Sequence, residues 1–202
     1  IYKISYKLKK ENAWAVILML IFMPVYFANM NTSLTEVLGG LVLVSAIYLF
    51  LSEKFIPAAL ILSFMPFART EGLMFLPLFI LAFLWLKRYH ALPFLLVGYI
   101  LFSLLGMVVH GDFWWFFSSM PYHVDSTEIY GSGSFFFYIG RFHEIMGYPL
   151  VILAVVGIID LIRRMFRVRP DRSVAWTTEF LIIPAAFLGF IFFRNYFKTF
   201  FT

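Results

Sequence analysis

Seven apolar runs separated by short polar segments dominate the pattern along the chain. They occupy residues 13–30, 37–51, 55–68, 72–86, 91–109, 145–162 and 174–193. Several are shorter than the roughly 20 residues that a straight membrane-spanning helix needs. The pattern predicts an all-α fold, a polytopic transmembrane bundle of about seven helices. Because Pro57 and Pro66 interrupt the third run, residues 55–86 either span fully or form a re-entrant hairpin.

Composition favours a membrane over water as the solvent of this fold. Hydrophobic residues make up 62% of the 202 residues, charged residues only 13%, and the mean hydropathy is +0.89. These values exclude an ordinary soluble domain. The absence of cysteine excludes disulfides and thiolate metal sites.

The net charge of +5 indicates membrane topology and not a nucleic-acid-binding surface. With a cytoplasmic amino terminus, strict alternation through seven crossings puts 12 of the 16 basic residues inside. The inner set is Lys3, Lys7, Lys9, Lys10, Lys54, Lys87, Arg88, Arg163, Arg164, Arg167, Arg169 and Arg172, and the outer set is Arg69, Arg141, Arg194 and Lys198. Trp14, Trp85, Tyr89 and Trp176 then fall at the inner interface and Trp114 and Trp115 at the outer one. We expect a protein of the bacterial inner (plasma) membrane.

The chain begins at Ile1 without a methionine and stops just after an apolar run. We therefore expect residues 1–202 to be a fragment of a longer protein, forming a single transmembrane domain. No cleavable signal peptide is visible. Within this domain, residues 110–144 form a long extracytoplasmic loop whose aromatic residues lie in the interface or cover a cavity.

The short outer segments supply three charged candidates for substrate binding. Glu36 is the last residue of Ser33–Glu36, which fits a helix capping box. Alternatively, its carboxylate binds a sugar hydroxyl or a cation. Arg69 and Glu71 stand between two apolar runs, where charge is costly unless paired or facing a wet cavity. Thr70 is a candidate helix cap there, whereas the planar guanidinium of Arg69 suits a phosphate.

The long outer loop holds three of the four histidines. Its two His-x-Asp pairs, at residues 110–112 and 123–125, leave a divalent metal open, but the spacing matches no strong metal-site pattern, so we assign no metal ligand. The glycine-rich stretch after Tyr130 either approaches a phosphate closely or forms a plain turn. On the inner side, Asp160 is placed to pair with Arg163 or Arg164, and Glu179 is expected at the interface.

Three stretches together resemble a known family. They are Thr35–Glu36 opening a helix after a short outer loop, the sequence from Ala68 to Pro77 (ARTEGLMFLP), and a long outer loop with Ile129–Ser134 (IYGSGS) leading to Gly147–Leu150 (GYPL). Across roughly residues 13–162, this order and sidedness resemble the C-type superfamily of membrane glycosyltransferases, which includes the protein O-mannosyltransferases and the aminoarabinose transferases of lipid A.

The resemblance implies an enzyme that takes a sugar from a polyprenyl-phosphate carrier at the outer face and passes it to a lipid, glycan or protein acceptor. It places the general base in a first outer loop, which we expect upstream of Ile1, so this fragment lacks the catalytic acidic residue. It implies that the long outer loop helps to bind the donor, with Arg69, His123, Arg141 or His143 near its phosphate. Glu36, Glu71 and Tyr130 complete the expected substrate site.

Two other readings of the charged residues stay open. A transporter or flippase of a lipid or polar solute uses Glu36, Arg69 and Glu71 as coupling or substrate charges within a cavity. It predicts inverted repeats and polar residues near mid-membrane, but the sequence gathers its polar groups at one face. A membrane scaffold without enzymatic activity predicts no coherent cavity beneath the outer loop.

Overall fold

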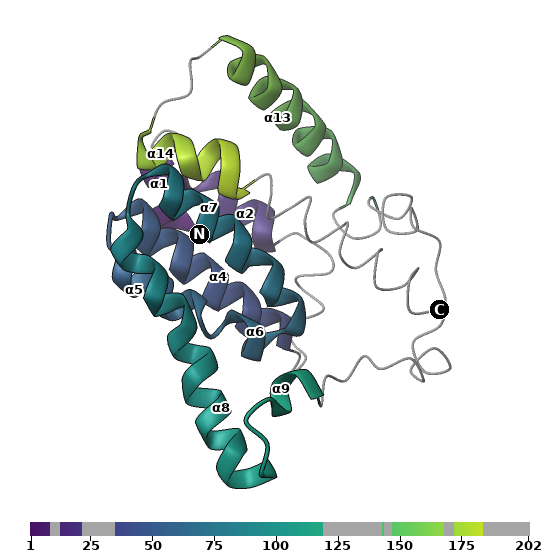
Figure 1. The fold of residues 1–202 in the computed structure, drawn as a ribbon. Helices are drawn as coiled ribbons and strands as arrows, with labels where there is room; N and C mark the ends of the chain where they lie inside the picture. The colour runs from purple at the N-terminus through teal and green to yellow at the C-terminus, as the bar shows by residue number, and fades with distance from the viewer. Residues whose placement is uncertain (9–12, 22–34, 119–142, 144–146, 168–171, 184–202) are drawn as a thin grey trace.

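The computed structural model describes residues 1–8, 13–21, 35–118, 143, 147–167 and 172–183 (Figure 1). These residues form helices joined by turns, and no strand occurs among them. The predicted all-α class is therefore confirmed for the described part of the chain.

The helical elements fall in the predicted apolar runs, with one addition before the first run and one after the fifth. In chain order they are α1 (Tyr2–Leu8), α2 (Ala15–Ile21), α4 (Thr35–Leu51), α5 (Phe55–Leu62), α6 (Met65–Ala68), η2 (Thr70–Met74), α7 (Phe75–Trp85), η3 (Tyr89–Leu96), α8 (Val97–His110), α9 (Trp115–Ser118), α13 (Tyr148–Arg167), α14 (Val174–Thr177) and η5 (Thr178–Ile182). The elements η2 and η3 are 3₁₀-helical, and η5 is π-helical. Each of the seven predicted runs contains at least one helix.

Phenylalanine rings form the centre of the bundle. Phe50 of α4, Phe55 of α5 and Phe79 and Phe83 of α7 are buried. Their ring centroids lie 5.5–6.3 Å apart, several in edge-to-face pairs. This geometry directs the positive edge of one ring at the negative face of the next. The rings thereby hold α4, α5 and α7 together.

The helical segment of the third run is broken at Ser63, where another helix comes unusually close. The Ser63 hydroxyl donates to the Leu60 carbonyl oxygen (2.6 Å) and accepts from the backbone N–H of Gly98 (3.0 Å). A Cβ on Gly98 would lie 2.3 Å from the Ser63 carbonyl oxygen. Only glycine permits this approach of α8 to the end of α5.

Basic residues gather at one end of the bundle, which we call the basic end: α1, the turns at residues 52–54 and 86–88, and α14. Lys7 Nζ donates to Ser52 Oγ (2.9 Å), and the Arg88 guanidinium lies 4.9 Å from the ring of Phe55. Trp85 stacks on Trp176 with a centroid distance of 6.1 Å. These contacts bring segments far apart in the sequence together at one end of the bundle.

At the opposite end, which we call the polar end, lie the start of α4, the turn between α6 and η2, and the end of α8 with α9. Figure 1 shows α1 and α14 in the upper part of the bundle and α6, α9 and the end of α8 in the lower part. Chain direction alternates between the two ends, because α4 runs toward the basic end, α5 and α6 away from it, and α7 back again.

One helix in the described part of the chain is long and apolar enough to cross a membrane, Tyr89–His110, formed by η3 and α8. Val37–Leu51, Phe55–Ala68 and Gly72–Trp85 are shorter apolar helices. The 14-residue segment Phe55–Ala68 would extend about 21 Å as a straight α-helix, below the roughly 30 Å of a bilayer core. The described residues therefore form an all-α bundle with one helix of spanning length. They do not show the seven crossings predicted from the sequence.

Candidate functional site

Arg69 lies at the polar end, in a sharp break between two short helices. Its backbone is extended (φ −153°, ψ 135°), between the end of α6 and the start of η2. Its N–H donates to the Met65 carbonyl oxygen (3.0 Å), and its carbonyl oxygen accepts from Gly72 (2.8 Å). A Cβ on Gly72 would lie 2.5 Å from the Met65 carbonyl oxygen. The turn is therefore closed by backbone contacts that leave no space for a side chain at residue 72.

The aliphatic stem of Arg69 packs on the first part of α4. A Cβ on Gly39 would lie 3.2 Å from Cγ and 3.3 Å from Cδ of Arg69. Gly39 stands one turn after Glu36, so both residues occupy the same side of α4 near its start. The structure thus places Arg69 against α4 at Gly39, one turn after Glu36.

For Glu36 and Glu71 the structure describes only the backbone, in the first turns of α4 and η2. The helix beginning at Thr35 agrees with the prediction, although Ser33 of the expected capping box is outside the described residues. The prediction that Thr70 caps the next helix is wrong. Thr70 is the first residue of η2, and Arg69 holds the N-cap position without a side-chain cap bond, because the helix starts two residues earlier than its hydrophobic pattern indicates.

Asp112 organises the segment that follows α8. Its Oδ1 accepts from the backbone N–H of Trp114 (2.8 Å) and its Oδ2 from the hydroxyl of Ser118 (2.6 Å). The Ser118 and Trp114 hydrogen bonds lower the pKa of the Asp112 carboxyl below its usual value, because they favour its charged form. Asp112 therefore holds the turn of α9 together as a carboxylate.

The aromatic segment folds back onto α8. The Trp115 indole N–H donates to the Phe102 carbonyl oxygen (2.9 Å), and a Cβ on Gly106 would lie 1.6 Å from Cδ1 of Trp115. Phe67, two residues before Arg69, stacks on Phe102 at 4.1 Å. The α9 segment reaches the same phenylalanine, since Phe116 lies 4.9 Å from Phe67. The aromatic segment and the α6 helix that leads to Arg69 are thus parts of one packed unit.

The expected site residues of the long loop are mostly outside the described residues. This applies to His123, Tyr130 and Arg141. His143 is described just before α13, where its ring stacks on Tyr148 at 5.1 Å and its carbonyl oxygen accepts from Gly147 (2.8 Å). These contacts show His143 supporting the start of α13.

The first His-x-Asp pair has other contacts in this structure. The His110 ring stacks on Trp115 at 5.2 Å, while both oxygens of Asp112 accept hydrogen bonds. Among the described residues, no group of three or more His, Cys, Asp or Glu side chains is placed to hold a metal ion.

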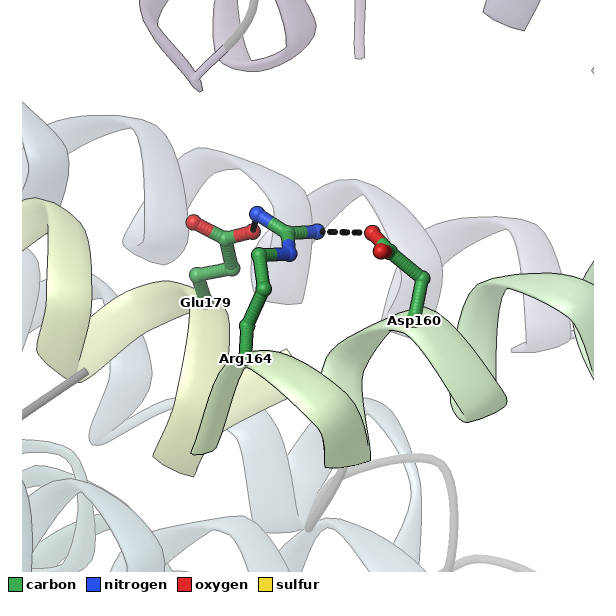
Figure 2. Close-up of polar contacts among 3 residues, drawn as sticks. All are labelled: Asp160, Arg164 and Glu179. Atoms are coloured by element: carbon green, nitrogen blue, oxygen red, sulfur yellow. Dashed lines mark hydrogen bonds and ion pairs between the residues drawn. The ribbon is translucent and has the colours of Figure 1, made fainter. Parts of the chain in front are cut away.

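The carboxylates at the other end form a charged cluster that the sequence predicted in part. Figure 2 shows Arg164 between Asp160 and Glu179, at 3.0 Å and 2.5 Å from their oxygens. The Asp160–Arg164 pair, one helical turn apart, was expected, whereas the contact with Glu179 joins α13 to η5 and no local spacing indicates it. The three side chains are partly exposed, so the cluster orients these elements and adds little stability.

No protein-family model, curated protein or solved structure matches this chain.

Proposed function

We propose that this chain is the membrane domain of a glycosyltransferase that takes a sugar from a polyprenyl-phosphate carrier at the extracytoplasmic face. The acceptor is a lipid, a glycan or a protein. The observation that carries the proposal is Arg69, a permanently charged side chain set at the polar end of an apolar bundle by a closed turn and a glycine on the neighbouring helix. The sugar and its polyprenyl-phosphate carrier are proposed from the order of the sequence motifs, which resembles that of the C-type glycosyltransferases.

A membrane location is part of this proposal and is supported by the exposed apolar surface. Val108 and Val109 of α8 are 83% and 72% exposed, and Ile152 of α13 is 63% exposed. Large apolar side chains exposed along helices are typical of surfaces that contact lipid or another protein. Further crossings beyond Tyr89–His110, to a total of about seven, belong to the proposal.

The chemistry of transfer requires a group like Arg69. When the sugar leaves the carrier, negative charge develops on the phosphate, and a preorganised donor in a partly dry site stabilises that charge. The planar guanidinium donates two parallel hydrogen bonds to phosphate oxygens and stays charged near a membrane. Glu36 and Glu71, with His123, Tyr130, Arg141 and His143, are the remaining proposed substrate ligands. The proposal assigns donor binding to this chain and leaves the general base unassigned.

Transfer of a radiolabelled sugar from polyprenyl-phosphate, in membranes that carry the full-length protein, tests this function. We expect Arg69→Ala to lower transfer by about 100-fold, the usual effect of removing one donor to a developing anion. The transfer rate of Arg69→Lys should lie between those of Arg69→Ala and the unchanged protein, because lysine keeps the positive charge but lacks the two parallel donors of the guanidinium. Lys54→Ala, which removes a cation at the basic end, is the matched control and should transfer like the unchanged protein.

Equal amounts of each variant in the membrane are required for this comparison, because the Arg69 stem packs on Gly39. Full transfer by Arg69→Ala would remove this residue from the donor site. If the unchanged protein transfers no sugar from any polyprenyl-phosphate donor, the glycosyltransferase is refuted and uptake or flipping of a lipid-linked solute becomes the activity to measure.

A further inference from the structure

A groove of about 500 Å³ lies at the basic end, between the end of α7 and the start of α14. Its walls are apolar and aromatic, with Leu84 and Trp85 on one side and Trp176 and Leu181 on the other. The groove is unrelated to the Arg69 segment, which lies at the polar end of the bundle.

Two cations line this groove and come from segments far apart in the sequence. Lys87 follows α7, and Arg172 precedes α14. Both are exposed, and neither forms an ion pair with any residue that the structure describes. None of the described residues that line the groove is a carboxylate. Its charge therefore complements an anion.

The aromatic wall fixes the relative position of the two cations. Trp85 and Trp176 stack with their planes 22° apart, and the Arg172 guanidinium lies 5.8 Å from the centre of the Trp85 ring. Lys87 is held in the left-handed backbone region (φ 56°) by the cap of α7, where its own N–H donates to Leu84 and that of Arg88 to Phe83. Both cations thus project from defined positions.

The apolar part of the groove continues along α7 away from the charges. Leu81 and Leu84 lie one turn apart on the exposed side of α7, 54% and 41% exposed, and both line the groove. An anion bound by Lys87 and Arg172 would therefore have an apolar strip directly beside it. This arrangement matches a molecule with a phosphate at one end and an acyl chain at the other.

We propose that this groove binds one anionic glycerophospholipid, with its phosphate between Lys87 and Arg172 and an acyl chain along Leu81 and Leu84. The inference rests on the membrane location in the proposed function and is independent of sugar transfer. Basic and aromatic residues at a cytoplasmic membrane interface are the groups that anionic headgroups contact.

Native mass spectrometry of the full-length protein, released from nanodiscs of equal phosphatidylglycerol and phosphatidylcholine, tests this site. The unchanged protein should retain phosphatidylglycerol in preference to phosphatidylcholine. The double variant Lys87→Gln and Arg172→Gln should reduce that preference about tenfold, because two surface cations are lost. The matched control, Lys54→Gln with Arg163→Gln, removes two cations that do not line the groove and should keep the preference.

A second variant tests the apolar part without changing charge. Leu84→Trp fills the groove and should reduce retention of phosphatidylglycerol to the level of the double variant. Equal losses in the groove and control double variants, full retention by Leu84→Trp, or no lipid preference in the unchanged protein would each overturn the site. Recovery of the protein in the soluble fraction would refute the membrane location itself, while sugar transfer by the groove variants should stay normal.

Discussion

The contact between Gly98 and Ser63 gives the most direct test of how the helices pack. Gly98→Ala places a methyl group 2.3 Å from the Ser63 carbonyl oxygen and 2.6 Å from its carbonyl carbon. Ordinary contact begins near 3.4 Å. The two backbones must therefore separate by about 1 Å, as in other overpacked cores.

Three contributions set the expected change in the free energy of unfolding, two of them destabilising and one stabilising. Overpacking costs about 1–3 kcal/mol. Stretching the 3.0 Å hydrogen bond from Gly98 to the Ser63 hydroxyl costs about 1 kcal/mol more. Alanine recovers about 1 kcal/mol through its higher helix propensity. We expect Gly98→Ala to lower the free energy of unfolding by about 1–3 kcal/mol, since the steric contribution exceeds the propensity gain.

Unfolding in detergent micelles, followed by circular dichroism against added denaturing detergent, measures this difference. Gly40→Ala is the matched control, because Gly40 is also in a helix and no atom of the described residues lies within 4 Å of a Cβ there. It should raise stability by up to about 1 kcal/mol. The double variant Gly98→Ala with Ser63→Ala should remain unstable, because the backbone of Ser63 is the obstacle. Equal stabilities for Gly98→Ala and Gly40→Ala would refute the close approach of α5 and α8.

Three further variants test the burial of Phe83, the backbone conformation of Glu53 and the hydrogen bonds of Asp112. Phe83→Ala should lower the free energy of unfolding in micelles by about 3–5 kcal/mol, because the lost transfer free energy of the ring adds to the cost of the cavity it leaves. A loss no larger than that of exposed Val108→Ala would contradict the burial of Phe83. Glu53→Gly should raise stability by about 0.5–1 kcal/mol in the same assay, because Glu53 occupies the left-handed region (φ 58°), and a loss would contradict this. The hydrogen bonds that lower the pKa of Asp112 stabilise the α9 turn fully above the usual pKa of 3.8. This stabilisation is lost as the pH falls through the lowered pKa, so tryptophan fluorescence should change below about pH 4. Asp112→Ala should abolish that transition, and an unaltered transition would contradict the assignment.

The sequence predicts where the helices lie and much less about how they pack. Polar segments and prolines interrupt the apolar runs, so breaks such as the one near Pro66 and the turn at Arg69 are visible as local features. The approach of Gly98 to Ser63 is not visible in the sequence, because it depends on a residue 35 positions away and leaves no periodic pattern. The run expected at residues 145–162 was placed correctly, but α13 continues through charged residues to Arg167.

The same distinction holds for the candidate sites. Arg69 stands out as a charge between apolar runs, and the structure adds the glycine of α4 that its stem packs on. Thr70 was misassigned because capping residues and first-turn residues share the same polar character. The groove at Lys87 and Arg172 was missed, because its two walls are joined only by the stacking of Trp85 on Trp176. Both tryptophans were expected at the inner interface, but a shared interface does not indicate that two residues are in contact.

Cysteine labelling from each side of the membrane tests whether the polar end and the basic end of the bundle lie on opposite sides. Residues 1–202 contain no cysteine, so a single substitution gives this part of the protein one labelling site. We would introduce Glu53→Cys at the basic end and His110→Cys at the end of α8, and treat intact cells with a maleimide that cannot cross membranes. With the polar end outside the cell, residue 110 should be labelled in intact cells and residue 53 only after permeabilisation. Labelling of both residues under the same condition, or in the reverse order, would contradict it.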